Sequence, residues 1–481
     1  MPSIKENFFY SAILTSANYV FPLITYPYVS RVLGVTKIGI CNFVDSIVNY
    51  YILFSMMGLM AVGIREISAS RDDPAKLSRT FSSLFCINTI STFIVAAAFV
   101  AAIFCVPKLY EYKELMFVGL FKVIFNYLMV EWFYKGIENF KYITKLGIIT
   151  KLMYVVSVFA FVRDSSDYPT FYLLSMLMIA ANAAVNLTHS RKFIKFSLSG
   201  ITFRPYMKSF FVLGVYMLLT SMYTGFNVAY LGFVCGETEV GYYTTATKLH
   251  SIFLALFTAF TGVMLPRMSL LASTGDVEGF KAMLQKSFHV LFLFAMPVVV
   301  FATVYAPQII MIISGAGYEP AITPMRVVMP LILIIGYEQI AVMQVLMPLK
   351  KDRAIFINAC IGAVVGIVAN VILVGALRST GSAIVWVLSE VAVLGSASYF
   401  ISKYIKVGFP TREILKSIVC SVPCILLSVF VYKQVENDFV CILIGSVTII
   451  AYYAFVYVYV LKDALVVSIM DRVRNIFNSP K

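Results

Sequence analysis

The sequence has little charge and no long polar segment. Only 13% of its 481 residues are charged, 60% are apolar and the mean hydropathy is +0.88. Soluble domains carry about 25% charged residues, so a soluble globular protein is excluded. One membrane span uses roughly 20 apolar residues. The composition therefore suffices for a dozen or more spans and excludes a peripheral enzyme with a single anchor.

The sequence also lacks the common signatures of nucleotide and metal chemistry. It contains no GxxxxGK[ST], no HExxH and no paired CxxC. ATP hydrolysis and metal catalysis thus have no support, and we expect no cofactor and no bound metal. The eight cysteines lie mostly in apolar runs. They are interpreted as small buried hydrophobic residues rather than as disulfides or metal ligands.

Continuous apolar runs, separated by charged or Pro/Gly-rich breaks, predict membrane-spanning helices. Fourteen such runs lie near residues 8–30, 38–60, 81–106, 114–134, 143–162, 168–190, 208–232, 242–264, 288–313, 324–346, 355–377, 380–400, 416–432 and 439–461. The predicted fold class is therefore an all-α polytopic membrane protein with 14 transmembrane helices.

Basic residues are distributed unequally between the two sides of the predicted membrane. The side that holds both termini carries 27 Lys and Arg, the opposite loops carry 7, and four lie within spans. By the positive-inside rule, both termini are expected in the cytoplasm. The net charge of +14, from 38 basic and 24 acidic residues, then reflects topology, and we expect no nucleic-acid partner.

The predicted loops are short, none exceeding about 20 residues. A membrane glycosyltransferase or polymerase usually needs a larger extramembrane loop or domain to hold a catalytic site. We therefore expect that the protein is not an enzyme. A glycosyltransferase or polymerase stays a formal alternative that the short loops disfavour.

An internal repeat emerges when the sequence is aligned with itself at an offset of 202 residues. YVSRVLGVTKIG (28–39) matches YLGFVCGETEVG (230–241) through a shared G-x-T-x-[IV]-G turn, and the same offset pairs Arg65 with Arg267. Six predicted spans separate the copies, and an even number returns the chain to the same side of the membrane. We expect two parallel repeats, as in transporters whose halves move around a central site.

This repeat gives the predicted domain organisation. Residues 1–205 hold spans 1 to 6 and form one lobe, and residues 206–405 hold spans 7 to 12 and form the other. Residues 406–481 hold spans 13 and 14 and a cytoplasmic tail, without a counterpart in the repeat.

Charged residues within the spans are the main functional candidates. A charge near the middle of a span costs roughly 2.5–3.5 kcal/mol, so each one needs a partner, water or a function. At about 1.5 Å per residue, the deepest of the basic residues lie roughly 10–12 Å inside their spans. The basic candidates are Lys122, Lys151, Lys248 and Arg326, and the acidic candidates are Asp45, Glu338 and Glu390.

Two interpretations of these charges stay open. In the first, a water-filled cavity between the lobes receives an anion on the basic side chains, while Asp45, Glu338 and Glu390 bind a coupling cation or hold the bases in place. In the second, the charges reach the membrane interface or form ion pairs that tie helices together. The three histidines are interpreted as structural.

Several short stretches, taken in order, point to a family. They are YVSRVLGVTKIG (28–39), GIREIS (63–68), EWFYKGIENFKYIT (131–144), VGYYTTATKL (240–249), MLPRMS (264–269), GAGYEPAITPMRVVMPLILI (315–334) and LMPLKKDR (346–353). At these positions of a chain with fourteen predicted spans, they resemble the Wzx-type polysaccharide repeat-unit flippases. These are also called O-antigen transporters, and they belong to the multidrug/oligosaccharidyl-lipid/polysaccharide exporter superfamily.

The resemblance implies a function in transport. Such a protein moves an undecaprenyl-diphosphate-linked oligosaccharide from the cytoplasmic to the outer leaflet of a bacterial inner membrane. It has a V-shaped, two-lobed fold that alternates between inward and outward openings. Separately from the resemblance, the carboxylates of Glu338 and Glu390 within the predicted spans lead us to expect coupling to a proton or sodium gradient. The implied partners are the lipid-linked oligosaccharide, membrane lipid and other polysaccharide-assembly membrane proteins. A basic cavity agrees with this, because hydrocarbon excludes the charge of a diphosphate.

The resemblance also singles out three arginines in the family's arginine-bearing motifs. Arg31, Arg65 and Arg267 are candidates for guiding the head group or stabilising a gate. Anchoring at the interface and helix capping are the open alternative for them. In the second repeat, the position that matches Arg31 is Phe233, so this arginine has no symmetric counterpart.

Two related functions also stay open. A flippase for the peptidoglycan lipid precursor would carry the same diphosphate and prenyl groups, so electrostatics does not separate it from an O-antigen flippase. A multidrug exporter of the same superfamily would bind amphipathic cations and need an acidic cavity. The deep basic residues, at least as many as the deep acidic ones, disfavour the exporter.

Overall fold

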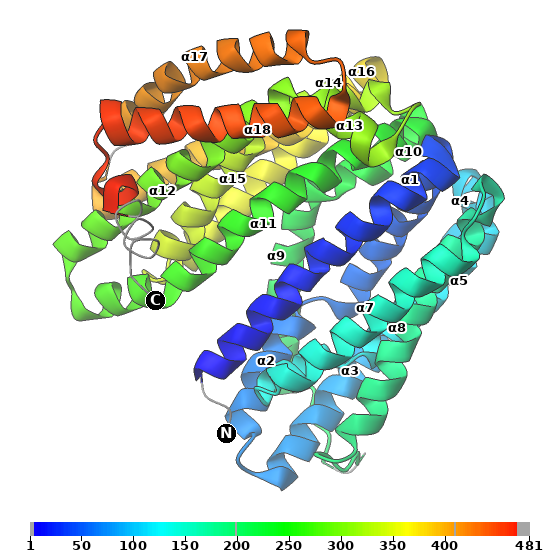
Figure 1. Cartoon of the computed structure of the whole chain (residues 1–481). Coiled ribbons are helices and arrows are strands. Elements are labelled where there is room, and N and C mark those ends of the chain that lie inside the picture. The colour runs from blue at the N-terminus through cyan, green and yellow to red at the C-terminus, as the bar shows by residue number, and fades with distance from the viewer. Residues whose placement is uncertain (1–3, 198–199, 408–409, 469–481) are drawn as a thin grey trace, which may run out of the picture. The chain divides into compact units, whose positions relative to one another are not determined.

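The protein is helical throughout the part that the structure describes. The computed structural model describes residues 4–197, 200–407 and 410–468, where every regular element is a helix (Figure 1). The first elements are α1 (Ile4–Met56), α2 (Leu59–Ser70), α3 (Pro74–Cys105), α4 (Pro107–Glu111), α5 (Lys113–Leu128), α6 (Glu131–Gly136), α7 (Phe140–Phe161), η1 (Ser165–Asp167), α8 (Tyr168–Ser190), α9 (Arg204–Thr224) and α10 (Phe226–Cys235). The remaining elements are α11 (Glu237–Thr274), α12 (Val277–Val304), α13 (Ala306–Ser314), η2 (Glu319–Ala321), α14 (Ile322–Val328), α15 (Leu331–Gln339), η3 (Ile340–Leu346), α16 (Asp352–Ile405), α17 (Thr411–Gln434), α18 (Asp438–Phe455) and η4 (Val456–Val460). Most of the predicted cytoplasmic tail, residues 469–481, lies outside the described residues.

The chain forms two compact units, each built from two stretches of sequence. Unit 1 contains Met1–Thr245 and Phe356–Val393, and unit 2 contains Ala246–Ile355 and Leu394–Lys481. The long helices α11 and α16 contribute to both units. These boundaries differ from those expected at 205 and 405 from the repeat, so the division into two lobes stays a prediction.

Many helices are long and apolar enough to cross a membrane. Within the described residues there are ten such helices or joined helices, and twelve if each of two bent pairs forms one span. The bent pairs are Arg204–Thr224 with Phe226–Cys235, at 49°, and Glu237–Ala255 with Phe260–Thr274, at 45°. The prediction of a multi-pass, all-α membrane protein is confirmed.

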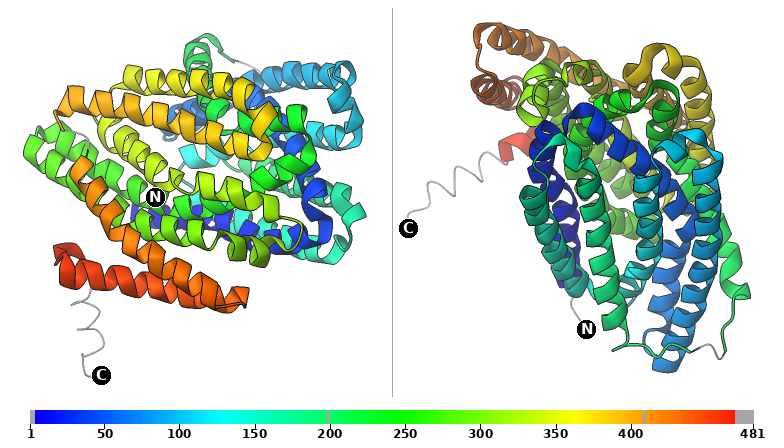
Figure 2. Two further views of the ribbon diagram at one scale, coloured as in Figure 1. Left: turned by 90° about the horizontal axis from the view of Figure 1, so that it is seen from above. Right: turned by 90° about the vertical axis from the view of Figure 1, so that its right-hand side faces the viewer.

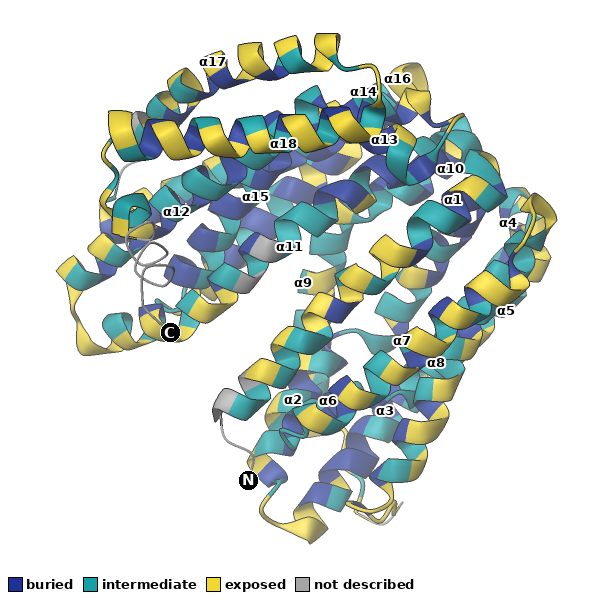
Figure 3. Ribbon diagram, viewed as in Figure 1, coloured by how far each residue is buried: buried dark blue, intermediate teal, exposed yellow. Residues whose placement is uncertain are grey.

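Apolar side chains cover the outer faces of these helices. Phe93 on α3, Ile372 on α16 and Ile450 on α18 are each more than half exposed. The exposed faces of α17 and α18 form yellow bands in Figure 3. A water-soluble monomer rarely exposes contiguous apolar surface of this kind, whereas in a bilayer such a surface contacts acyl chains. These faces are therefore expected to lie against lipid.

Helix α1 consists of two helices joined at a break. Its 53 residues would extend about 80 Å if straight, far more than a hydrocarbon core of about 30 Å. At Gly34, φ is +75°, which glycine tolerates, and the helical geometry is interrupted. Tyr28 Oη donates to Val162 O, and Cys41 Sγ donates to Tyr168 O. Both sides of the break thus lie beside the junction of α7 and α8, so the chain reverses direction there.

Helix α16 is a hairpin of two antiparallel helices. Its backbone leaves helical geometry at Arg378, where φ is +52°. Gly362 packs against Val393 and Gly366 packs against Ser389, so residues at equal distances from the turn are neighbours. In the left view of Figure 2, the yellow half of α16 turns back along the orange half. Each half is long enough to cross the hydrocarbon core.

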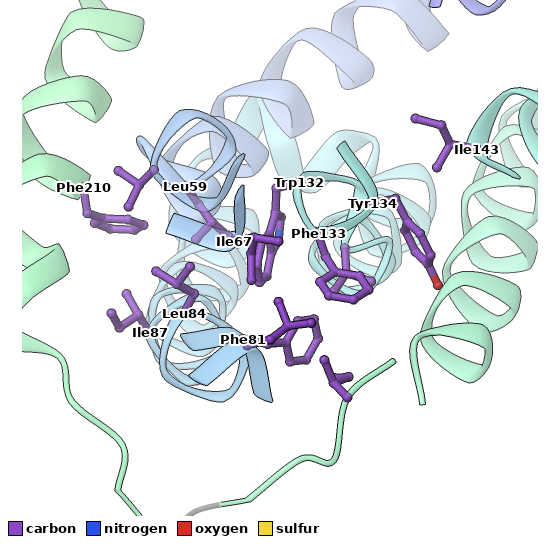
Figure 4. Packing of buried hydrophobic residues seen from close by; sticks show 14 residues of the cluster. Leu59, Ile67, Phe81, Leu84, Ile87, Trp132, Phe133, Tyr134, Ile143 and Phe210 are labelled. Carbon is purple, nitrogen blue, oxygen red and sulfur yellow. The ribbon is translucent and has the colours of Figure 1, made fainter. Parts of the chain in front are cut away.

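An aromatic core in unit 1 holds the short helix α6. The three aromatic residues 132–134 are fully buried, and Figure 4 shows them in one cluster with Phe81 of α3. Phe81 stacks on Trp132 with ring centroids 5.3 Å apart. Glu131 and Lys135, one turn apart on the same helix, lie outside this cluster and form an ion pair of 3.1 Å.

The two copies of the predicted repeat contact each other within unit 1. Thr36 Oγ1 and Thr238 Oγ1 are hydrogen-bonded at 2.9 Å. Asn42 Nδ2 donates to Thr244 Oγ1 at 2.8 Å. In both pairs the residues lie 202 positions apart, which is the offset of the sequence repeat. Equivalent residues of the two copies therefore meet.

A close approach of the two backbones requires glycine at this contact. A Cβ on Gly39 would lie 1.8 Å from the Glu237 carbonyl oxygen, and a Cβ on Gly241 would lie 2.3 Å from the Val35 carbonyl oxygen. These residues are again related by the offset of 202, so each copy places the same glycine against the same position of the other copy. This is the pattern of a twofold axis, and it supports the duplication that the sequence predicts.

Candidate functional site

Two of the predicted site residues, Lys122 and Asp45, form an ion pair in unit 1. The ammonium of Lys122, on α5, lies 2.7 Å from the carboxylate of Asp45, on α1. Tyr172 of α8 completes the cluster, because its hydroxyl donates to Asp45 at 3.3 Å. The Lys122 ammonium also lies 3.8 Å from the centre of the Tyr172 ring. Carboxylate and ring face together stabilise the ammonium.

Close helix packing brings these residues together. Helix α5 packs against both α1 and α8. Gly119, about one turn before Lys122, lies so near α1 that a Cβ on it would be 2.3 Å from the Val48 side chain. Asp45 precedes Val48 by about one turn and therefore faces the same part of α5. A larger residue at 119 would separate the two helices and lengthen the ion pair.

The charges of this cluster are balanced but unequally exposed. The side chain of Lys122 is 6% exposed, whereas that of Asp45 is 42% exposed. The carboxylate, and not the ammonium, therefore faces the surroundings. Asp45 would have to move aside or lose its charge before another anion could take its place at Lys122.

Lys151 lies in a second polar region of unit 1. Its ammonium donates to Asn18 Oδ1 of α1. Both residues line a cavity of about 250 Å³ between α1, α6, α7 and α8, together with the Glu131–Lys135 ion pair. The structure thus gathers Lys151 with Glu131 and Lys135, which belong to the EWFYKG stretch but are not among the predicted site residues.

The predicted arginines of unit 1 lie on its surface. Arg65, on α2, is exposed, pairs with the adjacent Glu66 at 2.8 Å and donates to Ser209 Oγ of α9 at 3.3 Å. It thereby ties α2 to α9. Arg31, in the first half of α1, is also exposed.

Four predicted site residues lie in unit 2. Lys248 and Arg267, both on α11, and Arg326, on α14, are exposed, and Glu338, on α15, is half-buried. The Nε of Arg326 donates to the carbonyl oxygen of Thr303 at 3.2 Å. This bond fastens α14 to the end of α12.

Glu390 lies in a buried polar layer of unit 1. It is 2% exposed, and its Oε1 accepts a hydrogen bond from Trp386 Nε1 at 2.9 Å, one turn earlier on α16. On the other half of α16, Asn370 Nδ2 donates to Asn227 Oδ1 of α10 at 2.7 Å. Sequence reasoning missed the two asparagines, because a neutral amide inside an apolar run is a much weaker signal than a charge.

A further ion pair joins the two repeats at their contact. Lys108, on α4, lies 2.5 Å from Glu237 at the start of α11 and 3.4 Å from Glu111. Burial lowers the pKa of Lys108, but its hydrogen bonds and charge attraction to the two carboxylates outweigh burial and raise that pKa. The sequence places Lys108 in a loop and gives no sign of its partner, which comes much later in the chain.

His289, on α12, contacts two acidic residues of unit 2, one on α17 and one in the segment after η4. Its Nε2 lies 2.9 Å from Asp463, and its Nδ1 lies 4.0 Å from Glu413 of α17. The three residues, with Lys281 and Lys286 of α12, line an open pocket of about 1070 Å³. In the part of the chain that the structure describes, no group of three or more His, Cys, Asp or Glu side chains is arranged to hold a metal ion.

Comparison with known proteins gives a family match over more than half of the chain. Residues 4–272 match the family described as polysaccharide biosynthesis protein. The chain is 24% identical over 348 residues to the "Putative O-antigen transporter" of Escherichia coli (strain K12), covering 72% of this chain and 84% of that protein. The protein of the same name from Shigella dysenteriae is 25% identical over 278 residues, covering 56% and 68% of the two chains.

The fold is similar to that of two solved membrane transport proteins. The fold is similar to that of the lipid II flippase MurJ in an inward closed conformation, with a TM-score of 0.74 and 14% identity over 94% of this chain and 99% of the other. It is also similar to an inward-facing multidrug resistance MATE family transporter of the MOP superfamily. Here the TM-score is 0.62 and the identity 14%, over 82% of this chain and 94% of the other. At such identities the similarity concerns the fold, and the predicted MATE-like fold is confirmed to that extent.

Proposed function

The chain belongs to the family of polysaccharide biosynthesis proteins, and we propose that it is a flippase for a lipid-linked oligosaccharide. It moves an undecaprenyl-diphosphate-linked repeat unit from the cytoplasmic to the periplasmic leaflet of a bacterial inner membrane, without changing a covalent bond. The match to proteins named as O-antigen transporters, over as much as 84% of their length, carries this conclusion. The fold agrees with it, since one solved structure with this fold is a lipid flippase.

The proposal includes fourteen spans with both termini in the cytoplasm. The count of twelve candidate spans rises by two when α1 and α16 each provide two, because each reverses direction at its break. The excess of basic residues on one side supports cytoplasmic termini. The contact between equivalent residues 202 positions apart supports lobes of 1–205 and 206–405, with 406–481 appended.

Lys122 is proposed to bind the diphosphate in exchange for Asp45. The diphosphate brings negative charge that hydrocarbon excludes, so it needs a cation within the membrane. When Asp45 takes up a proton or another cation, its hold on Lys122 weakens and a phosphate oxygen takes its place. Anion binding and cation uptake are then coupled at one ion pair. The greater exposure of Asp45 supports cation uptake before anion binding, because a proton or another cation has access to the carboxylate while the ammonium is buried.

The contact between the repeats is proposed to close the periplasmic side. In the predicted topology, residues 31–37 lie on that side of the membrane. The Thr36–Thr238 hydrogen bond and the Lys108–Glu237 ion pair both join the two repeats there. Alternating access then requires this contact to open.

The remaining charged residues keep their predicted roles as part of the proposal. The basic ones guide the anionic head group, and the acidic ones, with Asp45, provide the coupling-ion sites. They are Lys151, Lys248, Arg326, Arg31, Arg65 and Arg267 for the head group, and Glu338 and Glu390 for the ion. Transport that continues undiminished in vesicles after both proton and sodium gradients are collapsed would remove ion coupling. Other polysaccharide-assembly proteins are the proposed membrane partners.

Transport by the purified protein tests the proposal. Undecaprenyl-diphosphate-linked oligosaccharide with a fluorescent sugar is placed in both leaflets of vesicles, and a membrane-impermeant quencher measures the fraction in the outer leaflet. We expect protein-containing vesicles to expose the inner pool, and vesicles without protein to retain it. Lys122→Met is expected to slow exposure at least tenfold at equal protein content. An inner pool that stays protected in the presence of the wild-type protein contradicts the flippase.

The same vesicles separate the alternative functions. The lipid-linked peptidoglycan precursor tests the related flippase activity that the MurJ-like fold suggests. A fluorescent amphipathic cation tests multidrug export. We expect both to move more slowly than the oligosaccharide. Analysis of the recovered oligosaccharide for made or broken glycosidic bonds tests a glycosyltransferase or polymerase.

A further inference from the structure

The cavity of about 250 Å³ in unit 1, here called the amide cavity, has room for a ligand. Its volume equals that of about eight water molecules at roughly 30 Å³ each, which is enough for one sugar ring. Helices α1, α6, α7 and α8 enclose it. Its polar lining contains the charged residues Glu131, Lys135 and Lys151 and the amides Asn18, Asn182 and Asn186.

The charges of the amide cavity favour an anion. Lys135 is paired with Glu131 at 3.1 Å. Among the described residues, no carboxylate lies within 4.0 Å of the Lys151 ammonium, which donates to the Asn18 amide oxygen instead. Two lysines and one glutamate leave a net charge of +1 inside a membrane domain. Such a charge is stabilised by an anion and repels a cation, so this is no coupling-cation site.

The amides of the cavity favour a ligand with hydroxyl groups. Asn186 is 2% exposed, and within the described chain no donor reaches its Oδ1. Asn182 uses its Nδ2 to donate to Thr150 Oγ1 at 2.9 Å and to Met178 O at 3.1 Å, so its side-chain oxygen remains an acceptor. A buried acceptor without a donor is costly, and a ligand hydroxyl that donates to it removes that cost.

Donors are available beside these acceptors. An ammonium carries three N–H groups, and Lys151 and Lys135 each use one in the contacts just described. A sugar ring presents hydroxyls that donate and accept at neighbouring carbons. The lining thus matches a sugar better than it matches a metal ion, which needs acceptors alone, or an apolar molecule, which would leave every polar group unpaired.

We propose that the amide cavity binds one sugar residue of the substrate that carries an oxyanion, with the oxyanion at Lys151 and hydroxyls at Asn182 and Asn186. This inference rests on the proposed function and states which part of the lipid-linked oligosaccharide is recognised in unit 1. The oxyanion is a phosphate or a carboxylate on the sugar, and both form charge-assisted hydrogen bonds with an ammonium.

Binding of small soluble probes to the purified full-length protein in nanodiscs tests the proposal. The probes are glucose 1-phosphate, glucuronate and glucose, and the affinity of each is measured by calorimetric titration. We expect at least one charged probe to bind tenfold or more tightly than glucose. The tighter of the two charged probes identifies the oxyanion as phosphate or carboxylate. Equal affinity of all three probes, or no binding of any, overturns the proposal.

Variants assign the binding to the cavity. Lys151→Met is expected to weaken binding of the charged probe at least tenfold, and Lys151→Arg to retain most of it because the charge remains. Asn186→Ala is expected to weaken binding about fivefold through loss of one hydrogen bond. Lys145→Met is the matched control, since Lys145 is an exposed lysine on the same helix that does not line the cavity. Unchanged binding by Lys151→Met contradicts the assignment.

The vesicle assay separates this inference from the flippase itself. Wild-type protein that moves no lipid-linked oligosaccharide refutes the proposed function. If the wild-type protein moves the oligosaccharide and the Lys151→Met variant moves it at the same rate, with the same preference for charged over neutral sugars, the flippase stands. Only the proposal that the amide cavity binds a charged sugar is then refuted. A Lys151→Met variant that is slowed more strongly on a charged sugar than on a neutral one supports the cavity.

Discussion

At the residue scale, the Lys122–Asp45 pair has one well-buried member and one partly exposed member. Removal of one partner from a buried ion pair costs about 3–5 kcal/mol, because the other charge is left uncompensated. Removal of Asp45 leaves the more deeply buried ammonium without a counter-charge, whereas removal of Lys122 leaves a carboxylate that is 42% exposed to its surroundings. The two substitutions are therefore expected to differ in cost, although they break the same ion pair.

We expect Asp45→Asn to reduce stability by about 2–4 kcal/mol, more than Lys122→Met does. The double variant should lose less stability than the sum of the two single losses, since it contains neither charge and so leaves no buried charge without a partner. Thermal unfolding of the four proteins in one detergent measures this. Strictly additive losses would show that the two side chains do not interact in the folded protein.

Gly39 gives a second prediction at this scale. A Cβ on Gly39 would lie 1.8 Å from a carbonyl oxygen of the other repeat, so Gly39→Ala forces the two backbones apart. Overpacking of this kind typically costs about 1–3 kcal/mol. Gly262→Ala, also inside a helix but where a Cβ meets nothing within 4 Å, is the control and should lose no stability. Equal melting temperatures of the two variants in detergent would contradict the close contact.

The sequence predicts which charged residues are unusual, but not what they touch. Lys122 and Lys151 stand out because a charge in hydrocarbon is costly. Their neighbours Asp45 and Asn18 lie 77 and 133 positions away in the chain, and only the packing of α1 against α5 and α7 brings them close. The amide cavity is unpredictable for the same reason, since its lining comes from four helices.

At the element scale, helix positions follow from the apolar runs, but helix ends do not. The predicted spans 143–162 and 168–190 agree closely with α7 (Phe140–Phe161) and α8 (Tyr168–Ser190). Between 30 and 38 the sequence predicts a loop, whereas the structure has helix on both sides of a break at Gly34. A helix does not need to end where the hydrocarbon ends, because polar residues continue it into the interface. The length of an apolar run thus predicts where a span lies, but not where the helix ends or the chain turns.

The turn of the α16 hairpin places a non-glycine residue at a positive φ. Arg378 has φ of +52° and ψ of −130°, a region that costs most residues about 1–3 kcal/mol. Arg378 also lies 3.7 Å from Glu239, and both Arg378→Gly and Arg378→Ala remove this ion pair. We expect the glycine variant to be more stable than the alanine variant by about 1 kcal/mol, because only glycine relieves the strain. Chemical unfolding in mixed micelles compares the two, and an alanine variant of equal or greater stability would show that the turn is not strained.

At the scale of the whole molecule, the repeat is the feature that the sequence predicts best. One offset aligns the two G-x-T-x-[IV]-G turns, and the structure places residues related by that offset in contact. The sequence does not reveal that the copies touch, because identity between two segments carries no information on distance. It also does not reveal the compact units, whose boundaries depend on which helices pack together.

Cross-linking the two copies tests whether their contact must open during transport. In a background without the eight native cysteines, we expect Thr36→Cys with Thr238→Cys to form a disulfide on oxidation, since the hydroxyl oxygens lie 2.9 Å apart. The oxidised protein should lose at least nine-tenths of its transport in vesicles and regain it on reduction. Each single cysteine variant under the same oxidant is the control. Full transport by protein that mass spectrometry shows to be cross-linked would mean that this contact does not gate the pathway.

The contact made by Gly39 and Gly241 is self-complementary, because each repeat contributes the same glycine and the same facing position. Since Gly39 and Gly241 occupy equivalent places, a chain of half the length would already contain everything needed to dimerise with an identical copy inserted in the same direction. In such a homodimer, every substitution would act twice. When the copies are joined in one polypeptide, each half can be substituted independently of the other. The equivalent positions 31 and 233, which hold arginine and phenylalanine, have already diverged in this way.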